Sequence, residues 1–370
     1  MRNHLDMDEL DRQLDQATKL GFNKTELHYL RGTNEYQERM FCEEYLQFLE
    51  KFKLPQYHLN IDVVDGDIGL EFPGQWSCDT YWETIALSVV NELYYRSLLK
   101  KMTRFERNSV FAQGQLRLAE KIKALKGRAD ITFSEFGTRR RFSRAWQDYV
   151  VRSLAEELPP NQFIGTSNAY LAMKYGVMPI GTKAHEMDMV LAGIADSRGE
   201  DISQSVGQST CDWWEQYGWG LSIALPDTFG TDFFLRSMTP EQAKDWKGLR
   251  QDSGDPILFG EKVIAFYKRC DVDPREKLIV FSDGLDLGMI FKIADHFKGR
   301  IKTTFGWGTN LTNDLGFPSV SLVVKTVQAN GQGLVKLSDN LAKAIGNPKN
   351  IERYKSVFGY TGENYEECRY

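Results

Sequence analysis

One histidine in the sequence stands where a chemical role is plausible. His185 follows a short apolar run and the turn Gly181-Thr182, and Glu186 comes directly after it. A neutral imidazole is nucleophilic near physiological pH and can accept a phosphoryl group. A lone histidine is more often structural than catalytic, so the residue type alone leaves both interpretations open. The position of His185 after a predicted strand favours the chemical one.

Two carboxylates occupy the same kind of position after other predicted strands. Asp252 lies in the segment Arg250-Gln251-Asp252-Ser253-Gly254-Asp255-Pro256, and Asp283 lies in Phe281-Ser282-Asp283-Gly284. A carboxylate at a strand end can cap the helix that follows. It can also hold ribose hydroxyls or Mg²⁺. The residues leave these alternatives open.

Groups that suit anions complete the set. Arg139, Arg140 and Arg141 follow a Phe-Gly-Thr turn, and Gly306, Trp307, Gly308 and Thr309 follow another predicted strand. Arginine can bind phosphate or carboxylate through two parallel N–H groups, and backbone N–H groups in a glycine turn can cradle phosphate. Taken singly, three consecutive arginines are usually a solvated face, and a Gly-x-Gly segment is often only a tight turn. Together with a histidine and two carboxylates, they predict group transfer at a phosphorylated sugar.

The elements that must position these residues alternate between strand and helix from about residue 129. Such alternation predicts a parallel sheet, and this many units favour a barrel over an open sheet. In a parallel α/β barrel the active site lies at the carboxyl ends of the strands. The predicted strands are Ile131–Glu135, Gln162–Gly165, Val177–Gly181, Leu221–Leu225, Gly248–Gln251, Leu278–Ser282 and Ile301–Phe305.

The rest of the chain predicts a second, smaller lobe. Residues 1–128 are mixed α and β, with a hairpin formed by Leu59–Val64 and Ile68–Phe72 and a long helix over Trp82–Leu99. A second hairpin is expected around Asn330-Gly331, folding back toward the first lobe. We therefore divide the chain into a lobe of residues 1–128 with the returning tail 318–370, and a barrel of residues 129–317.

Composition excludes several function classes. The chain has 370 residues, a formal net charge of −5 and a pI of about 5.7, so a nucleic-acid-binding face is not expected. Its five cysteines form no C-x-x-C pair, which favours a reducing cytoplasm. No stretch of about 18 apolar residues predicts a membrane span.

The motifs resemble one family, in order and at suitable spacing. The segments F-x-E-F-G-T-R-R-R-F-S, G-T-S-N, G-T-x-A-H-E, R-x-D-S-G-D-P, F-S-D-G-L-D and F-G-x-G-T-x-L-T-x-D look like those of nicotinate phosphoribosyltransferase. The resemblance covers roughly residues 55–345. It implies an irregular, incomplete α/β barrel beside a smaller α+β lobe, usually in a homodimer. It also implies a role in NAD biosynthesis.

The resemblance implies roles for individual residues. His185 corresponds to a phosphohistidine that ATP phosphorylates, and Phe136 to the aromatic residue that stacks on the pyridine ring. Mg²⁺ would accompany the pyrophosphate of phosphoribosyl pyrophosphate, without assigned protein ligands. The catalytic residues implied are His185, Asp252 and Asp283. The implied substrate-binding residues are Phe136, Arg139, Arg140, Thr166, Ser167, Arg250, Ser253, Gly284, Gly306, Gly308 and Thr309.

The sequence departs from the family pattern at its start. Relatives begin with a segment of the type D-x-Y-K-x-x-M-Q, whereas this chain opens with MRNHLDMDELDRQ. We therefore expect the family's N-terminal segment to be missing, which puts the catalytic activity of the chain in question. A truncated, non-catalytic relative is one alternative.

Two related enzymes are further alternatives. Nicotinamide phosphoribosyltransferase carries Asp where this chain has Ser167, and it lacks the run Arg139-Arg140-Arg141. Quinolinate phosphoribosyltransferase is shorter and has no ATP-linked histidine. Both differences favour nicotinate as the substrate.

Overall fold

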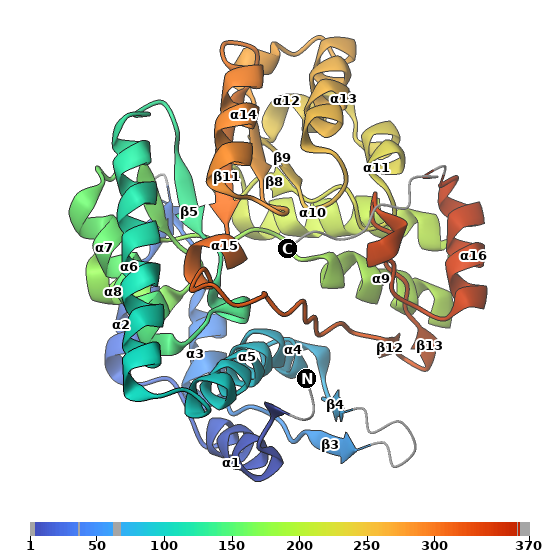
Figure 1. Cartoon of the computed structure of the whole chain (residues 1–370). Coiled ribbons are helices and arrows are strands. Elements are labelled where there is room, and N and C mark those ends of the chain that lie inside the picture. The colour runs from blue at the N-terminus through green and yellow to red at the C-terminus, as the bar shows by residue number, and fades with distance from the viewer. Residues whose placement is uncertain (1–3, 36–37, 62–67, 361, 363–370) are drawn as a thin grey trace.

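The computed structural model describes residues 4–35, 38–61, 68–360 and 362. Its first lobe is mainly helical, as Figure 1 shows in blue and blue-green. Helix starts carry local signals, such as the capping boxes at Asn23 and Thr103, which satisfy free backbone N–H groups. The elements of this lobe are α1 (Met7–Thr18), α2 (Lys24–Gly32), β1 (Asn34–Glu35), β2 (Glu38–Arg39), α3 (Glu43–Lys51), β3 (His58–Ile61), β4 (Ile68–Glu71), α4 (Trp76–Asp79), α5 (Trp82–Lys100) and α6 (Arg104–Lys126).

The predicted hairpin of the first lobe is present. Strands β3 and β4 pair antiparallel, with His58 opposite Glu71 and Ile61 opposite Ile68, while residues 62–67, the end of the predicted first strand and its turn, lie outside the described residues. Trp82, at the start of α5, is fully buried and stacks on Phe72 with ring centroids 4.8 Å apart. This contact joins the hairpin to the longest apolar helix of the lobe.

A seven-stranded parallel sheet forms the second part of the molecule. Its order is β7-β6-β5-β11-β10-β9-β8, and every neighbouring pair is parallel. Among the described residues no pairing joins β7 to β8, so the barrel stays open, and the predicted incomplete α/β barrel is confirmed. The strands are β5 (Phe133–Glu135), β6 (Phe163–Thr166), β7 (Met178–Pro179), β8 (Ile223–Ala224), β9 (Gly248–Gln251), β10 (Leu278–Phe281) and β11 (Lys302–Trp307).

Helices follow the strands in the order that the sequence pattern predicted. They are α7 (Arg144–Glu157), α8 (Ala169–Tyr175), α9 (His185–Ser197), α10 (Ser205–Tyr217), α11 (Thr231–Ser237), α12 (Pro240–Asp245), α13 (Pro256–Arg269), α14 (Leu287–Phe297), α15 (Thr309–Thr312) and α16 (Pro348–Phe358). Short 3-10 turns occupy Thr138–Arg140, Ile202–Gln204, Pro274–Glu276 and Leu341–Lys343. In the described part of the chain, none of the helices combines the length and the apolar character that crossing a bilayer needs.

The tail lies against the barrel helix α9 more than against the first lobe. Asn330 and Gly331 have positive φ and join β12 (Gln328–Ala329) to β13 (Gln332–Gly333), so the predicted hairpin exists but is short. Leu334 packs on Met189 of α9, so the hairpin does not fold back onto the first lobe as expected. The extended segment before it, drawn in Figure 1 between α15 and β12, does contact that lobe, because Lys325 pairs with Glu83 of α5.

One large apolar core joins the barrel strands, their covering helices, the second half of α5 and α6. The first lobe adds two smaller clusters of its own. The division of the chain at residues 128/129 and 317/318 remains a prediction. The large apolar core contains residues from both sides of the first boundary.

Candidate functional site

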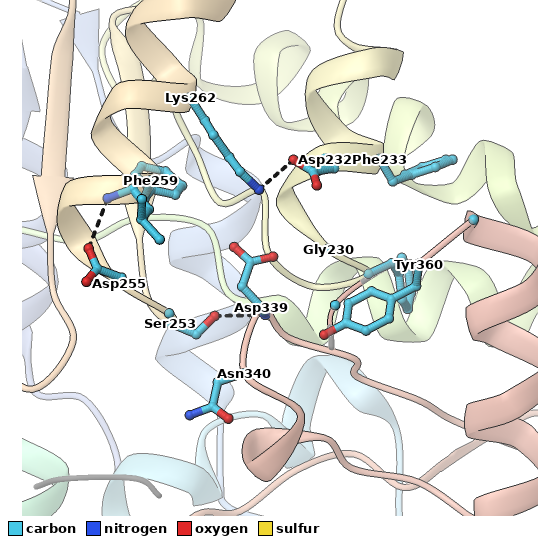
Figure 2. Close-up of a pocket in the computed structure, with 15 residues that line it drawn as sticks. Gly230, Asp232, Phe233, Ser253, Asp255, Phe259, Lys262, Asp339, Asn340 and Tyr360 are labelled. Atoms are coloured by element: carbon cyan, nitrogen blue, oxygen red, sulfur yellow. Dashed lines mark hydrogen bonds and ion pairs between the residues drawn. The ribbon is translucent and has the colours of Figure 1, made fainter. Parts of the chain in front are cut away.

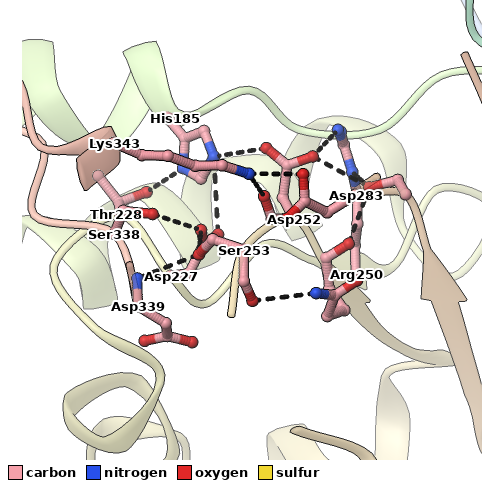
Figure 3. Close-up of polar contacts among 12 residues, drawn as sticks. His185, Asp227, Thr228, Arg250, Asp252, Ser253, Asp283, Ser338, Asp339 and Lys343 are labelled. Carbon is pink, nitrogen blue, oxygen red and sulfur yellow. Dashed lines mark hydrogen bonds and ion pairs between the residues drawn. The ribbon is translucent and has the colours of Figure 1, made fainter. Parts of the chain in front are cut away.

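The carboxyl ends of the barrel strands bring the predicted histidine and carboxylates together. His185 is the first residue of α9, and its Nε2 atom lies 3.0 Å from Oδ2 of Asp252, in the loop after β9. The Nδ1 atom lies 3.0 Å from Oγ1 of Thr228, in the loop after β8. Figure 3 shows the imidazole held between these two side chains. The ring is therefore fixed from both sides.

The buried surroundings of His185 disfavour its charged form. Burial lowers the pKa of its imidazole, and the ammonium of Lys336 lowers it further, against the opposing effect of Asp227 and Asp252. Asp227 Oδ1 lies 3.6 Å from His185 Nε2. A neutral ring is the form that can act as a nucleophile.

Asp252 stays ionised although it is largely buried. Burial alone would raise the pKa of its carboxyl, but Arg250 and His185 hold that pKa well below its usual range. Arg250 Nη2 donates to Asp252 Oδ1 at 2.7 Å, and Ser282 donates to the same oxygen at 3.0 Å. The loops after β9 and β10 are thereby locked together.

The pKa of the Asp283 carboxyl is shifted in the opposite direction from that of Asp252. Burial raises the pKa of the Asp283 carboxyl, and the nearby ammonium of Lys343, 2.5 Å from Oδ1, opposes that shift only in part. Lys343 also donates to the backbone carbonyl of Asp252 at 3.1 Å. Gly284, with φ of 57°, makes the turn that follows Asp283.

Phe136 and Gly306 form a flat wall. A Cβ atom on Gly306 would lie 2.6 Å from the Phe136 ring, so only glycine allows the ring this position. On the ring lies the guanidinium of Arg250, with its Cζ atom 5.7 Å from the ring centroid. Three predicted residues, from the carboxyl ends of three different strands, therefore meet at one aromatic surface.

Arg139 and Arg140 point toward other segments of the protein. Arg139 Nη1 pairs with Glu83 of α5 at 2.6 Å, and Arg140 Nε donates to the carbonyl of Leu322 at 3.3 Å. These arginines bring the first lobe and the extended tail to the edge of the site.

Thr166 and Ser167 have different environments. The Thr166 hydroxyl is fully buried and donates to Glu135 at 2.5 Å, so it joins the ends of the neighbouring strands β6 and β5. Ser167 is exposed and uses its backbone N–H to bond the Glu135 carbonyl at 2.8 Å. The structure therefore places Ser167 at the surface of the mouth and Thr166 beneath it.

Ser253 links the His185 cluster to a neighbouring cavity. Its hydroxyl donates to Asp227 at 2.5 Å and accepts from the backbone N–H of Asp339 at 3.0 Å. On its other side lies a cavity of about 410 Å³ (Figure 2), and burial raises the pKa of Asp339 there to about 6. The cavity is lined by Phe229, Gly230, Asp232, Phe233, Ser253, Gly254, Asp255, Leu258, Phe259, Lys262, Asp339, Asn340, Gly359, Tyr360 and Gly362.

Gly308 and Thr309 stand where β11 leads into the short helix α15. Gly308 lies before the first helical residue, and Thr309 begins the helix, half-buried. The position matches the expected turn after the last strand, and the backbone N–H groups of Leu311 and Thr312 bond back to Gly308.

Sequence reasoning missed four residues of this cluster. Asp227 and Thr228 follow β8, so the strand-end rule applied to the fourth strand would have found them. Lys336 and Lys343 come from the tail, and no strand or motif signal marked them.

Family comparisons agree with this geometry. Residues 131–362 match the nicotinate phosphoribosyltransferase (NAPRTase) family, and residues 2–91 match the N-terminal domain of the same family. The chain belongs to the nicotinate phosphoribosyltransferase family. The function predicted from the motifs is confirmed at this level. The expectation that the family's N-terminal part is missing is wrong: it rested on one short motif, whereas residues 2–91 match the family's N-terminal domain.

Solved structures agree as well. A nicotinate phosphoribosyltransferase from Porphyromonas gingivalis has 30% sequence identity and a TM-score of 0.85, over 95% of this chain and 88% of that one. One from Vibrio cholerae has 29% identity and a TM-score of 0.85, over 96% of this chain and 84% of the other. Both matches extend across the first lobe and the barrel.

Proposed function

We propose that the chain forms nicotinate mononucleotide and pyrophosphate from nicotinate and phosphoribosyl pyrophosphate, and that phosphorylation of His185 by ATP drives the reaction. The observation that carries the ATP coupling is the imidazole of His185, buried and held between Thr228 and Asp252 at the strand ends. Its lowered pKa keeps a nucleophilic nitrogen available. Transfer of the γ-phosphoryl group to the ring and its later hydrolysis would couple ATP to turnover.

The aromatic wall supports binding of a flat, negatively charged ring. Phe136 offers a face on which a pyridine can stack, and Arg139 and Arg140 can reach a carboxylate on that ring. The pyridine nitrogen needs only positioning, because it is already a nucleophile.

The charges of the mouth suit cleavage at C1 of the sugar. Breaking the C1–oxygen bond develops positive charge on the ribose ring and negative charge on the pyrophosphate. Arg250, Lys336 and Lys343 are basic side chains placed near the strand ends, and Asp252 and Asp283 are acidic side chains beside them. Such fixed charges stabilise a charge-separated transition state without reorganisation.

We propose that Mg²⁺ enters with phosphoribosyl pyrophosphate. In the described ranges, no three His, Cys, Asp or Glu side chains are grouped so as to hold a metal ion. Mg²⁺ commonly keeps waters and binds substrate phosphates with few protein ligands, which fits this arrangement.

Radiolabelling tests the ATP coupling. The parent chain, incubated with γ-labelled ATP, is expected to carry acid-labile label, and His185→Ala is expected to carry none. His296→Ala is a matched control, because His296 also contacts a carboxylate, Glu261 at 2.7 Å, but lies exposed on α14. An unlabelled parent chain would contradict the coupling and favour a non-catalytic relative.

Steady-state assays test the substrate. With nicotinate, nicotinamide and quinolinate in parallel, we expect nicotinate to give the highest kcat/KM and ATP to raise it. A preference for nicotinamide would overturn the assignment.

We also propose that the chain acts as a homodimer in the cytoplasm. The family resemblance supports the dimer, and light scattering would test it. The four described cysteines, Cys42, Cys78, Cys211 and Cys270, are unpaired, which supports a reducing compartment.

A further inference from the structure

A chain of buried polar side chains lies behind His185, on the side away from Asp252. Thr228 Oγ1 donates to Asp188 Oδ2 at 2.7 Å, and Asp188 Oδ1 pairs with Lys183 Nζ at 2.6 Å. Ser209 also donates to Asp188 and accepts from Lys183 at 2.8 Å. The side chains of Lys183 and Asp188 are each only 1% exposed. We call Thr228, Asp188 and Lys183 the His185 relay.

The contacts of the His185 relay determine which of its atoms carry protons. A carboxylate this deeply buried is stable as an ion only when it is paired, and Lys183 supplies the opposite charge. An ionised carboxylate can only accept hydrogen bonds, so the single hydroxyl proton of Thr228 points to Asp188. The oxygen of Thr228 then offers only lone pairs to His185 Nδ1, 3.0 Å away.

His185 Nδ1 must therefore be the donor in that contact. A deprotonated Nδ1 would set its lone pair against those of Thr228. The other ring nitrogen, Nε2, faces Asp252 Oδ2 at 3.0 Å and Asp227 Oδ1 at 3.6 Å (Figure 3), so a proton on this side is shared with the Asp252 carboxylate and can leave the ring. The two nitrogens thus have distinct roles.

We propose that Thr228 and Asp188 are positioning residues that hold a proton on Nδ1 of His185, so that Nε2 is the atom that takes the phosphoryl group. This inference rests on the ATP coupling proposed above. It goes beyond that coupling by naming the reacting nitrogen and the residues that select it.

The proposed chemistry balances. The Nε2 lone pair attacks the γ-phosphorus, the bond to the bridging oxygen breaks, and ADP leaves with that electron pair. Any proton that Nε2 shares with Asp252 passes to this carboxylate. In hydrolysis, a water hydroxyl joins phosphorus, its other proton goes to solvent, and the N–P electron pair returns to Nε2, which can take back the proton from Asp252.

A proton on Nδ1 matters in both directions. It keeps the ring neutral once the proton shared by Nε2 has passed to Asp252, and it makes the leaving group a neutral imidazole during hydrolysis. Without it, the leaving group would be imidazolate, which is a much stronger base. A hydrogen-bond partner on the second ring nitrogen commonly fixes tautomer and orientation in this way.

The test compares Thr228→Val with Thr228→Ser. Valine keeps the shape but removes the oxygen, so we expect phosphoenzyme formation to slow about 10- to 100-fold, the range typical for loss of a partner behind a reactive histidine. Serine restores the oxygen and should restore the rate. Thr210→Val is the matched control, because Thr210 is also a buried threonine whose hydroxyl bonds a backbone carbonyl, that of Val206 at 2.7 Å. Circular dichroism of each variant verifies folding.

Nitrogen NMR of ¹⁵N-histidine-labelled chain gives a readout that a purely structural role would not move. With His185→Ala used to assign the signal, Nδ1 of His185 should be protonated in the parent and in Thr228→Ser, and this preference should be lost in Thr228→Val. Coupling between ³¹P and ¹⁵N should place the phosphoryl group on Nε2. A phosphoryl group on Nδ1, or a Thr228→Val chain phosphorylated at the parent rate, would overturn the proposal.

The two proposals fail separately. If ATP leaves the parent chain unlabelled, the ATP coupling falls, whereas the nitrogen spectrum still reports which ring nitrogen holds the proton. A spectrum with Nδ1 unprotonated overturns the relay even where phosphorylation occurs.

Discussion

The two halves of the strand-end site are built differently. Around His185, the side chains from the loops after β8 and β9 and from the start of α9 are buried and bond mainly to one another. Around Phe136, the arginines reach Glu83 of the first lobe and Leu322 of the tail. The first half is therefore organised mainly by barrel loops, to which the tail adds Lys336 and Lys343, whereas the second depends on how the first lobe and the tail meet it. Substitutions in the first half should affect chemistry most, and those in the second should affect nicotinate binding.

The largest expected effect is that of Asp252→Asn. The amide removes the charge that pairs with Arg250 and contacts His185, so kcat/KM should fall on the order of 100- to 1,000-fold, as for loss of one group that stabilises transition-state charge. Steady-state kinetics with nicotinate would measure it. Asp255→Asn, an exposed helix cap three residues later, is the control and should stay near the parent value. Equal losses in both variants would refute the special role of Asp252.

Arg139→Met should produce the next effect, and it should appear in KM. A charged hydrogen bond to a substrate carboxylate contributes about 1.5–3 kcal/mol, which predicts a KM for nicotinate about 10- to 100-fold higher. Arg144→Met, an exposed arginine at the start of α7, serves as the control. A fall in kcat with unchanged KM would place Arg139 in the chemical half instead.

Lys336→Met should change the pH dependence of His185 phosphorylation. Protonation charges the imidazole, and the Lys336 ammonium disfavours that charge, so removing it raises the pKa of His185. Asp227 and Asp252, which favour the charged ring, then act unopposed by Lys336. The neutral fraction should therefore fall at a higher pH in the variant, and the acid limb of the rate of label incorporation should move upward. An unmoved limb would show that another group controls it.

The smallest effect is expected for Glu83→Gln. Glu83 pairs with Arg139 and Lys325, so the variant loosens the junction between the first lobe, the site and the tail. A partly exposed ion pair contributes about 0.2–1 kcal/mol, which predicts a rise of about 1.5- to 5-fold in the KM for nicotinate. Glu92→Gln, farther along α5 and bonded to Arg144, is the control. A larger fall in kcat than rise in KM would contradict the proposed division of the site.

The barrel was predictable because its strands are short and most of their residues are buried. Such strands give compact apolar runs, and polar residues begin where they end, so all seven were found and Gly248–Gln251 had its observed bounds. At the other strands, the predicted and the observed ends differ by one or two residues. Hydrogen bonds between strands set the observed ends, and the sequence pattern does not encode them. Phe136, Arg250, Asp252 and His185 followed from the same rule.

Other parts of the site could not be found this way. Lys336 and Lys343 reach the strand ends only because the tail crosses the barrel, and that path depends on contacts such as Leu334 with Met189. The partners of Arg139 and Arg140 likewise depend on how distant segments pack. Local sequence patterns determine the helices and strands, whereas these contacts form only when the helices, strands and tail pack together.

The origin of Lys336 and Lys343 in the tail has a consequence for biosynthesis. During translation the ribosome makes the loops that carry Asp227, Asp252 and Asp283 well before it makes these two lysines. In a nascent barrel Asp252 already has Arg250 beside it, whereas Asp227 and Asp283 precede the tail lysines near them. Binding of polyanionic substrates should begin only when the tail has been released and has docked, which would keep unfinished chains from consuming nucleotide.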